Sequence, residues 1–352
     1  MDRRTFLALA GGSVAGLALP AGLSAVAEPS GMAPSNLRVQ TARYRWRDAA
    51  TEDLVSVFPD VPPPVLRMTQ GMPFSIDVTN TLAEATTMHW HGMRVPNEMD
   101  GVPYLTQFPI QKDETWRYSY TPEDAGVYWY HPHCRAMEQI ARGLTGIIVV
   151  AEKDDPGFDG ETVLNLRDFR IGKDDQVLEL YSARTGSFGT VVTANWEQNP
   201  VYEHRAGSLV RLRIGATDTT RFYTLVFEGG EGRIIAADGH PLREALRCPT
   251  AESPTLVAPG QRLDVALRMP EHEGEEIVVT YQSRQRIRPL ATLRAADKSL
   301  GRSLSDLKPP QPNDVPDFNP AGLEIIEMIF GWSPDGLKPN NGFCGSIGYT
   351  FW

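Results

Sequence analysis

Short runs of alternating apolar and polar residues recur along the chain and predict β-strands. Phe74, Ile76 and Val78 alternate with the polar residues Ser75 and Asp77. Such a period of two places one face of a strand in the core and the other in solvent. Further strands are predicted at residues 116–120, 127–130, 146–150, 210–214, 263–267 and 276–281. Glycine and proline separate the runs, so the chain is predicted to be all-β, and only one helical turn is expected, at Ala136–Ala141.

The predicted strands fall into two groups of similar size. Residues 37–155 are predicted to form a first domain and residues 160–296 a second domain. Residues 297–321 contain five prolines and little apolar sequence, which is typical of an extended linker. A new apolar run then opens residues 322–352, which are predicted to be the start of an incomplete third domain.

Composition and charge narrow the classes of function. Apolar residues make up 41% of the chain and charged residues 22%, as in an ordinary globular protein. The net charge is −10, which argues against a nucleic-acid partner because phosphate binding needs a basic face. The pattern of Cys134, Cys248 and Cys344 does not resemble a disulfide framework, and no role is predicted for them.

The N-terminal residues 1–27 are predicted to be an export signal. Arg3 and Arg4 are separated from Phe6-Leu7 by one residue, and a stretch rich in glycine and alanine follows. Paired arginines at this place resemble the twin-arginine signal, so a periplasmic or otherwise exported location is expected. Because glycines and Pro20 interrupt the apolar stretch, a permanent membrane span is not expected.

Two histidine pairs are the candidate metal site. His89 and His91 flank Trp90, and His131 and His133 flank Pro132, so four of the seven histidines lie in two short segments. Residues two apart in a strand point to the same face, and a proline confines the second pair to a strand end or sheet edge. Four imidazoles that converge at one rim favour a transition metal, and copper binds such nitrogen donors most strongly among the divalent first-row ions. His204, His240 and His272 are expected to have no metal role.

The segments around these pairs resemble the multicopper oxidases, the laccase-like enzymes. The resemblance lies in Met88-His89-Trp90-His91-Gly92 with Asp100-Gly101, and in Gly126–His133 with Gln139 and Arg142-Gly143-Leu144. Residues 208–268 are similar to the second domain of that family. The resemblance implies a string of cupredoxin-like Greek-key β-sandwich or barrel domains.

The resemblance also implies a copper site and an activity. His89 matches a ligand of the type-2 copper, and His91, His131 and His133 match ligands of the type-3 copper pair. Asp100 matches an acid that helps to deliver protons, and Asp-Gly at this place is also good turn chemistry. The implied reaction couples one-electron oxidation of a small phenolic or metal-ion substrate to the reduction of molecular oxygen to water.

One part of the family pattern is absent from this sequence. No histidine follows His272, so the family's third-domain ligands and its type-1 copper motif are missing. Cys134 follows His133 directly, but a type-1 site there would need a second imidazole, and none lies between Cys134 and His204. Three explanations stay open: a product truncated before the third domain, a non-enzymatic exported copper-binding protein, or an enzyme whose missing ligands come from a partner chain.

Overall fold

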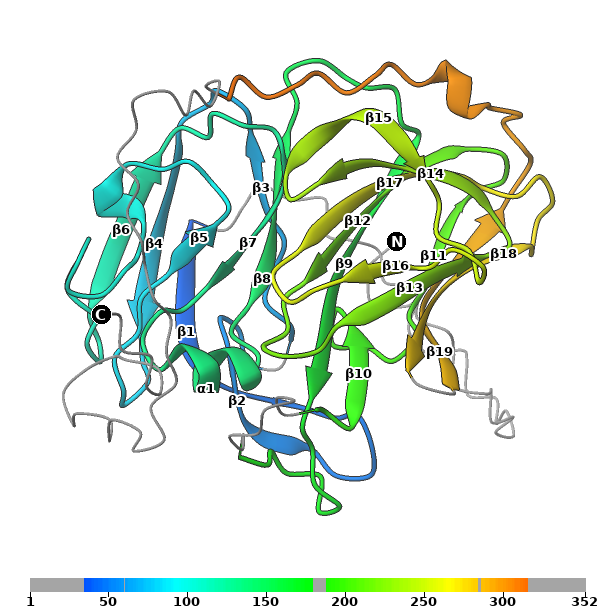
Figure 1. Ribbon diagram of the computed structural model, residues 1–352. Coiled ribbons are helices and arrows are strands. Elements are labelled where there is room, and N and C mark those ends of the chain that lie inside the picture. Colours follow the sequence, from blue (N-terminus) through cyan, green and yellow to red (C-terminus); the bar gives the residue numbers. More distant parts are fainter. Residues whose placement is uncertain (1–34, 60, 180–187, 284–285, 316–352) are drawn as a thin grey trace, which may run out of the picture.

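The computed structural model describes residues 35–315, apart from residue 60, residues 180–187 and residues 284–285 (Figure 1). The predicted signal segment, the predicted start of a third domain and Cys344 lie outside the described residues. The described chain is built from β-sheets, with one short α-helix and two 3-10 helices. The predicted all-β class is therefore confirmed. None of the described helices has the length and apolar character needed to cross a membrane.

The first half of the chain forms two four-stranded sheets. The outer sheet contains, in spatial order, β2 (Thr51–Ser56), β1 (Asn36–Tyr44), β4 (Phe74–Asn80) and β6 (Thr115–Tyr120). The inner sheet contains β3 (Leu66–Thr69), β8 (Gly146–Ala151), β7 (Gly126–His131) and β5 (His89–His91). The helices of this half are η1 (Asn97–Met99) and α1 (Ala136–Ala141). Apolar side chains from both sheets, Trp90 among them, pack into one core between the sheets.

The second half forms two larger sheets. One contains β10 (Val191–Ala194), β9 (Gly160–Phe169), β12 (Leu209–Ala216), β17 (Arg262–Arg268), β14 (Glu231–Ala237) and β15 (His240–Arg247). The other contains β11 (Val201–Arg205), β19 (Arg286–Ala296), β18 (Glu276–Ser283), β13 (Tyr223–Glu228) and β16 (Thr255–Val257). These sheets enclose a second and separate apolar core. The short η2 (Leu304–Asp306) follows them.

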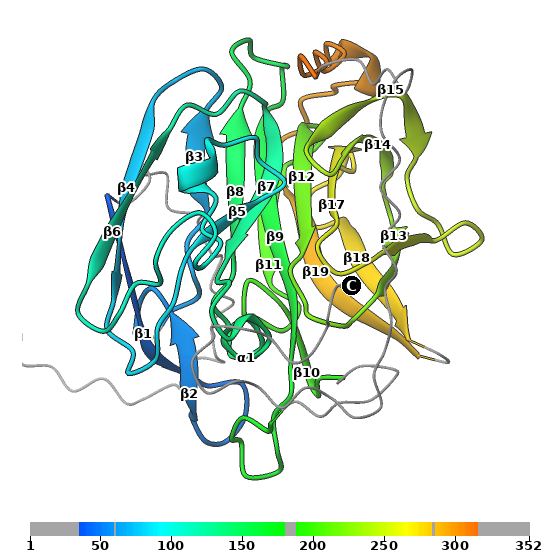
Figure 2. The ribbon, with the colours of Figure 1, turned by 60° about the vertical axis from the view of Figure 1, so that its left-hand side comes forward.

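The two halves pack against each other through their inner sheets. Figures 1 and 2 show β7 and β8 of the first half beside β9 and β12 of the second half. Between these strands lies a small apolar cluster that includes Val127, Trp129 and Val163. The strand that ends at His131 is thus supported on one face by the core of the first half and on the other by the second half.

Two local details refine the sequence predictions. The second histidine pair does not lie wholly in a strand, because β7 ends at His131 and the chain turns before α1. Pro132 explains the end of the strand, since it has no N–H to donate to a ladder. The described part of the predicted linker also makes contacts: the Asn313 side chain donates to the backbone oxygens of Ala125 and Gly239, both at 3.0 Å.

Candidate metal centre

Neighbouring antiparallel strands bring one histidine of each pair together. In the ladder between β5 and β7, His89 stands opposite His131, and Trp90 stands opposite Tyr130. Side chains alternate along a strand, so Trp90 enters the core while His89 and His91 share the other face. Cross-strand pairing therefore places three of the four predicted imidazoles on one face of the sheet.

The three imidazoles on β5 and β7 converge. One ring nitrogen from each of His89, His91 and His131 lies within 4.8 Å of the other two. His91 Nδ1 is 3.2 Å from His131 Nε2. Two nitrogens that each lie about 2 Å from one metal ion are separated by about 3–4 Å. The spacing of these three residues therefore fits nitrogen ligands of a metal centre.

His133 joins the cluster from the turn after β7. Its ring centroid is 4.5 Å from that of His89 and 5.2 Å from that of His131. Its backbone N–H donates to Thr87 Oγ1 at 3.2 Å, which ties the turn to the segment that leads into β5. The structure thus brings together all four histidines that the sequence singled out.

Burial keeps three of these imidazoles, those of His91, His131 and His133, neutral at physiological pH. His131 is only 7% exposed, and burial holds its pKa well below the ordinary value of 6.5. Burial also lowers the pKa of His91 to about 3, helped by the charge of Arg262, and that of His133 to about 4. A neutral imidazole keeps a lone pair on one ring nitrogen, which is the form that binds a metal.

Asp100 holds the ring of His89 by its backbone as well as its side chain. His89 Nδ1 lies 2.7 Å from the Asp100 carbonyl oxygen and 3.3 Å from its Oδ1. Both oxygens accept hydrogen bonds, so the Nδ1–H of His89 is the donor. Its Nε2 then keeps its lone pair toward the other rings. Gly101, with φ of +78°, permits this approach, because a Cβ there would lie 2.0 Å from the Met88 carbonyl oxygen. The predicted turn role of Asp-Gly and the contact with His89 are both present.

The second half also reaches the cluster, which sequence patterns alone did not indicate. The guanidinium of Arg262, on β17, donates to the Val127 carbonyl of β7 at 3.3 Å. A Cβ on Gly260 would lie 3.7 Å from the His91 ring. The Trp129 ring packs against both His91 and His131, with centroid distances of 4.7 and 4.2 Å. Arg262 and Gly260 stand in the segment that resembles the family's second domain, and that resemblance is the one sequence signal for them.

The other histidines lie outside this group. His204 Nε2 is 2.6 Å from Thr162 Oγ1, and His240 Nδ1 is 3.2 Å from Asn313 Nδ2. His272 is in an exposed turn. Neither Cys134 nor Cys248 belongs to the histidine cluster, and burial raises the pKa of the Cys248 thiol to about 12.

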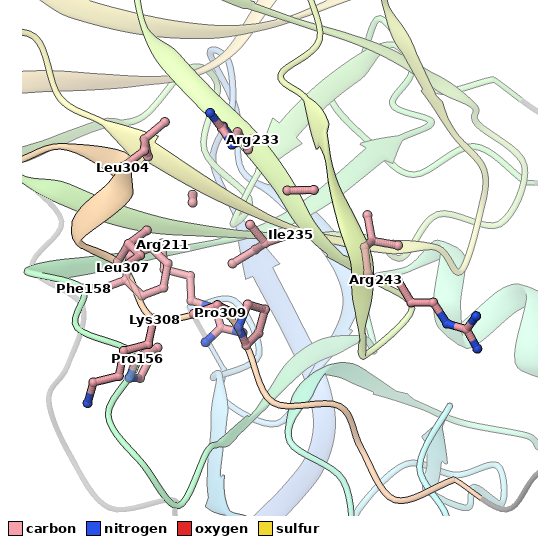
Figure 3. Close-up of a pocket in the computed structure, with 14 residues that line it drawn as sticks. Pro156, Phe158, Arg211, Arg233, Ile235, Arg243, Leu304, Leu307, Lys308 and Pro309 are labelled. Atoms are coloured by element: carbon pink, nitrogen blue, oxygen red, sulfur yellow. The ribbon is translucent and has the colours of Figure 1, made fainter.

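A cavity of about 220 Å³ lies elsewhere, between the β14–β15 hairpin and the segment around η2 (Figure 3). Its lining is apolar and basic, and includes Phe158, Ile235, Arg211 and Lys308. No histidine, cysteine or carboxylate lines it. Metal-binding chemistry is therefore confined to the rim formed by β5 and β7, as far as the described residues go.

Comparisons with known proteins agree with this geometry. A family model described as multicopper oxidase matches residues 38–155. A solved multicopper oxidase from Pseudomonas thermotolerans superposes with a TM-score of 0.73 at 32% identity, over 84% of this chain and 71% of that chain. The cupredoxin-like fold is thereby confirmed.

Two curated relatives are longer than this chain. Copper resistance protein A of Escherichia coli is 26% identical, over 75% of this chain and 50% of the relative. The multicopper oxidase MmcO of Mycobacterium tuberculosis is 27% identical, over 76% of this chain and 56% of the relative. This chain thus spans about half the length of these relatives. The extent of its match to a solved multicopper oxidase, together with the family model over its histidine-bearing half, shows that the chain belongs to the multicopper oxidase family.

Proposed function

We propose that the protein is an oxidoreductase that binds copper at His89, His91, His131 and His133 and reduces molecular oxygen. Membership of the family implies copper. The observation that carries the proposal is the convergence of three ring nitrogens within 4.8 Å, with His133 beside them. Imidazole nitrogens in this number favour copper over the harder divalent ions, which prefer oxygen ligands.

The proposed roles of the four histidines follow their positions. His89 would bind the type-2 copper, and its Nδ1–H is occupied by the Asp100 carbonyl, so Nε2 is the ligand atom. His91, His131 and His133 would bind the type-3 pair. Copper, when bound, supplies the one-electron chemistry by which oxygen is reduced to water.

Asp100 is proposed to handle protons. Its side chain is 34% exposed, and its Oδ1 lies 3.3 Å from a ring nitrogen of His89. A carboxylate that touches both solvent and the metal-binding rings can take up a proton from water and release it toward the site. Reduction of oxygen to water consumes protons, so this position suits the proposed reaction.

The reducing substrate is proposed to be a small phenol or a reduced metal ion, in line with the resemblance. The site is also proposed to work outside the cytoplasm, after export by the twin-arginine route. Arg3 and Arg4 before Phe6-Leu7 support this route. Replacing both arginines with lysines should leave the protein in the cytoplasmic fraction, and an unchanged distribution would contradict the export proposal.

Oxygen consumption by the copper-loaded full chain tests the proposal. We expect uptake of oxygen when a phenol such as 2,6-dimethoxyphenol is added, and none in the His131→Ala variant. His204→Ala is the matched control, because it removes a partly buried histidine that lies outside the cluster. Copper bound by the four histidines without oxygen uptake would favour the non-enzymatic copper-binding protein instead.

A further inference from the structure

Arg167 is a fully buried arginine of the second half whose hydrogen bonds go mainly to the first half. It lies on β9 and is 0% exposed. Its Nη1 donates to the Thr145 hydroxyl at 3.2 Å and to the Thr217 carbonyl at 3.0 Å. Its Nη2 donates to the carbonyls of Ile140 and Ala141. Three of these four acceptors lie at or just after the end of α1.

Burying the guanidinium of Arg167 carries a large desolvation cost. No carboxylate within 4 Å pairs with its guanidinium among the described residues, and its Nε has no hydrogen-bond partner there. Burial lowers its pKa below the ordinary value, although the charges of Asp218 and Asp168 oppose this. A buried charge destabilises a fold unless hydrogen bonds or opposite charges compensate for its lost hydration. Its contacts are carbonyls at a helix C-terminus, where partial negative charge gathers and a cation is favourable.

The helix that Arg167 caps is tied to both histidine pairs. α1 begins at residue 136, directly after the turn that carries His133. Gln139, on α1, accepts from the Thr86 hydroxyl at 2.8 Å and donates to the Ala85 carbonyl at 3.1 Å. The neighbouring Thr87 accepts from the His133 N–H. A shift of α1 would therefore displace the segment before β5 as well as the turn after β7.

The second half also encloses the turn that follows α1. Gly143 has a φ of +121°, and a Cβ there would lie 2.5 Å from the Trp196 ring. The Thr145 carbonyl accepts from Asn165 Nδ2 at 3.1 Å, and its hydroxyl lies 2.9 Å from that of Thr217. Contacts of this closeness leave the end of α1 little freedom to move independently of β9.

We propose that Arg167 is a positioning residue for the metal centre, which acts from the second half by fixing the C-terminal end of α1. Through α1 it sets the orientation of His133 and His131 relative to β5. The inference rests on the proposed function of the four histidines as copper ligands. It gives the second half, which contributes no histidine to the cluster, a direct part in building the site.

Two substitutions and one control test this role in the full chain. Arg167→Met removes the guanidinium but keeps a long side chain, and Arg167→Lys keeps the charge but cannot span acceptors on both sides. Arg213→Met is the control, because Arg213 is also buried in the second half but pairs with the carboxylates of Glu161 and Asp264 instead of with carbonyls of α1. A general loss of stability should affect the control at least as strongly as the Arg167 variants.

Three readouts report on the site itself. In the copper-free protein, histidine-selective NMR should show shifted ring signals of His131 and His133 for Arg167→Met, with those of His204 unchanged. Copper affinity should fall about tenfold in Arg167→Met, a typical loss for a residue that orients ligands, and by less in Arg167→Lys. The electron paramagnetic resonance signal of bound Cu(II) should change in Arg167→Met. In Arg213→Met, the ring signals and the copper affinity should match the wild type.

The outcomes separate this inference from the proposed function. If the wild type binds copper and Arg167→Met binds it equally well with the same ring signals, the positioning role is wrong. If the wild type binds no copper, the proposed function fails, while the ring signals of the copper-free variants still decide whether Arg167 orients the histidines. Should Arg167→Met fail to fold, Thr145→Val provides the same test, because it removes one acceptor of Arg167 with little change in shape.

Discussion

Each half of the molecule contains a cluster of buried titratable side chains. In the second half the charges of the cluster are paired with one another, and we call this cluster closed. In the first half the imidazoles are not paired in this way, and we call this cluster open. In the second half, Arg211 and Arg213 both donate to Asp264, which is 2% exposed. Glu152 and Glu161 complete this group, so every charge meets an opposite charge. In the first half, four imidazoles face one another, and the described residues place no cation-binding carboxylate among them except Asp100 at the rim.

The difference shows how one architecture supports both a structural and a binding cluster. Burial alone would lower the pKa of Arg211, but Asp264 and Glu152 raise it above its ordinary value. Burial lowers the pKa of His91 and of His133, and the charge of Asp100 opposes this only in part at His133, so their lone pairs remain available. In a closed cluster opposite charges compensate one another for their burial, whereas an open one gains its stabilisation from a bound metal.

Acid should destabilise the open cluster most. The folded-state pKa values of His91, His131 and His133 lie below the unfolded value of 6.5. At a pH between the folded and unfolded pKa values, the unfolded chain therefore binds more protons than the folded chain. Stability is then fully present above pH 6.5 and is lost as the pH falls toward about 4. We expect the copper-free protein to lose on the order of 4 kcal/mol of unfolding free energy across this window, measured by urea denaturation.

The matched comparison is a triple change of these three histidines to glutamine, which should remove most of this acid sensitivity. His204→Gln should remove a smaller part, since burial also lowers the pKa of His204 to about 4. If the triple variant loses as much unfolding free energy in acid as the wild type, the histidine cluster is not the cause of the acid sensitivity.

Opening the closed cluster should be the next largest effect. Asp264→Asn leaves Arg211 and Arg213 buried with one carboxylate partner fewer. We expect the unfolding free energy to fall by about 3 kcal/mol. His91→Gln, in the open cluster, should cost less than 1 kcal/mol at pH 8, because no charge loses its partner. Equal losses in the two variants would remove the distinction between the clusters.

Closing the open cluster with copper should stabilise the protein. Free copper at one hundred times its dissociation constant should raise the unfolding free energy by about 2.7 kcal/mol, measured by thermal or urea unfolding. The His131→Ala variant should show little of this gain, whereas Asp264→Asn should keep all of it. A gain that is the same in His131→Ala would place the copper elsewhere.

The smallest effect should come from the carboxylate of Asp100. Asp100→Asn leaves the backbone carbonyl that holds His89 in place, so copper affinity should fall only about threefold. Gly101→Ala should weaken copper binding more, because its Cβ would push the loop away from the Met88 carbonyl. Competition titration with a copper chelator distinguishes the two. The opposite order would mean that the side chain, not the backbone, orients His89.

The positions of the strands and the candidate histidines could be predicted from the sequence, because both follow from local geometry. The alternation at Phe74, Ile76 and Val78 reflects the core directly, and it corresponds to β4. The i, i+2 spacing of His89 and His91 fixes their common face in any strand. Local geometry of this kind depends on neighbours in the chain and can be predicted without a fold.

Contacts between distant segments could not be predicted in this way. Pro132 predicts a strand end or sheet edge for the second histidine pair, but it does not predict that β7 ends at His131 and leaves His133 in the turn. The contact of Arg167 with α1 joins residues 26 and 27 apart, and that of Arg262 with Val127 joins residues 135 apart. Such contacts depend on how the two halves pack, and nothing in the local pattern of either segment encodes that packing.

A titration of the full chain with Cu(I), followed by histidine-selective NMR, directly tests whether the four clustered histidines bind copper. Cu(I) is diamagnetic, so the ring signals of all seven histidines stay observable. We expect the signals of His89, His91, His131 and His133 to shift together and saturate, while those of His204, His240 and His272 stay in place. Saturable shifts of the second group, with the first group unchanged, would contradict it.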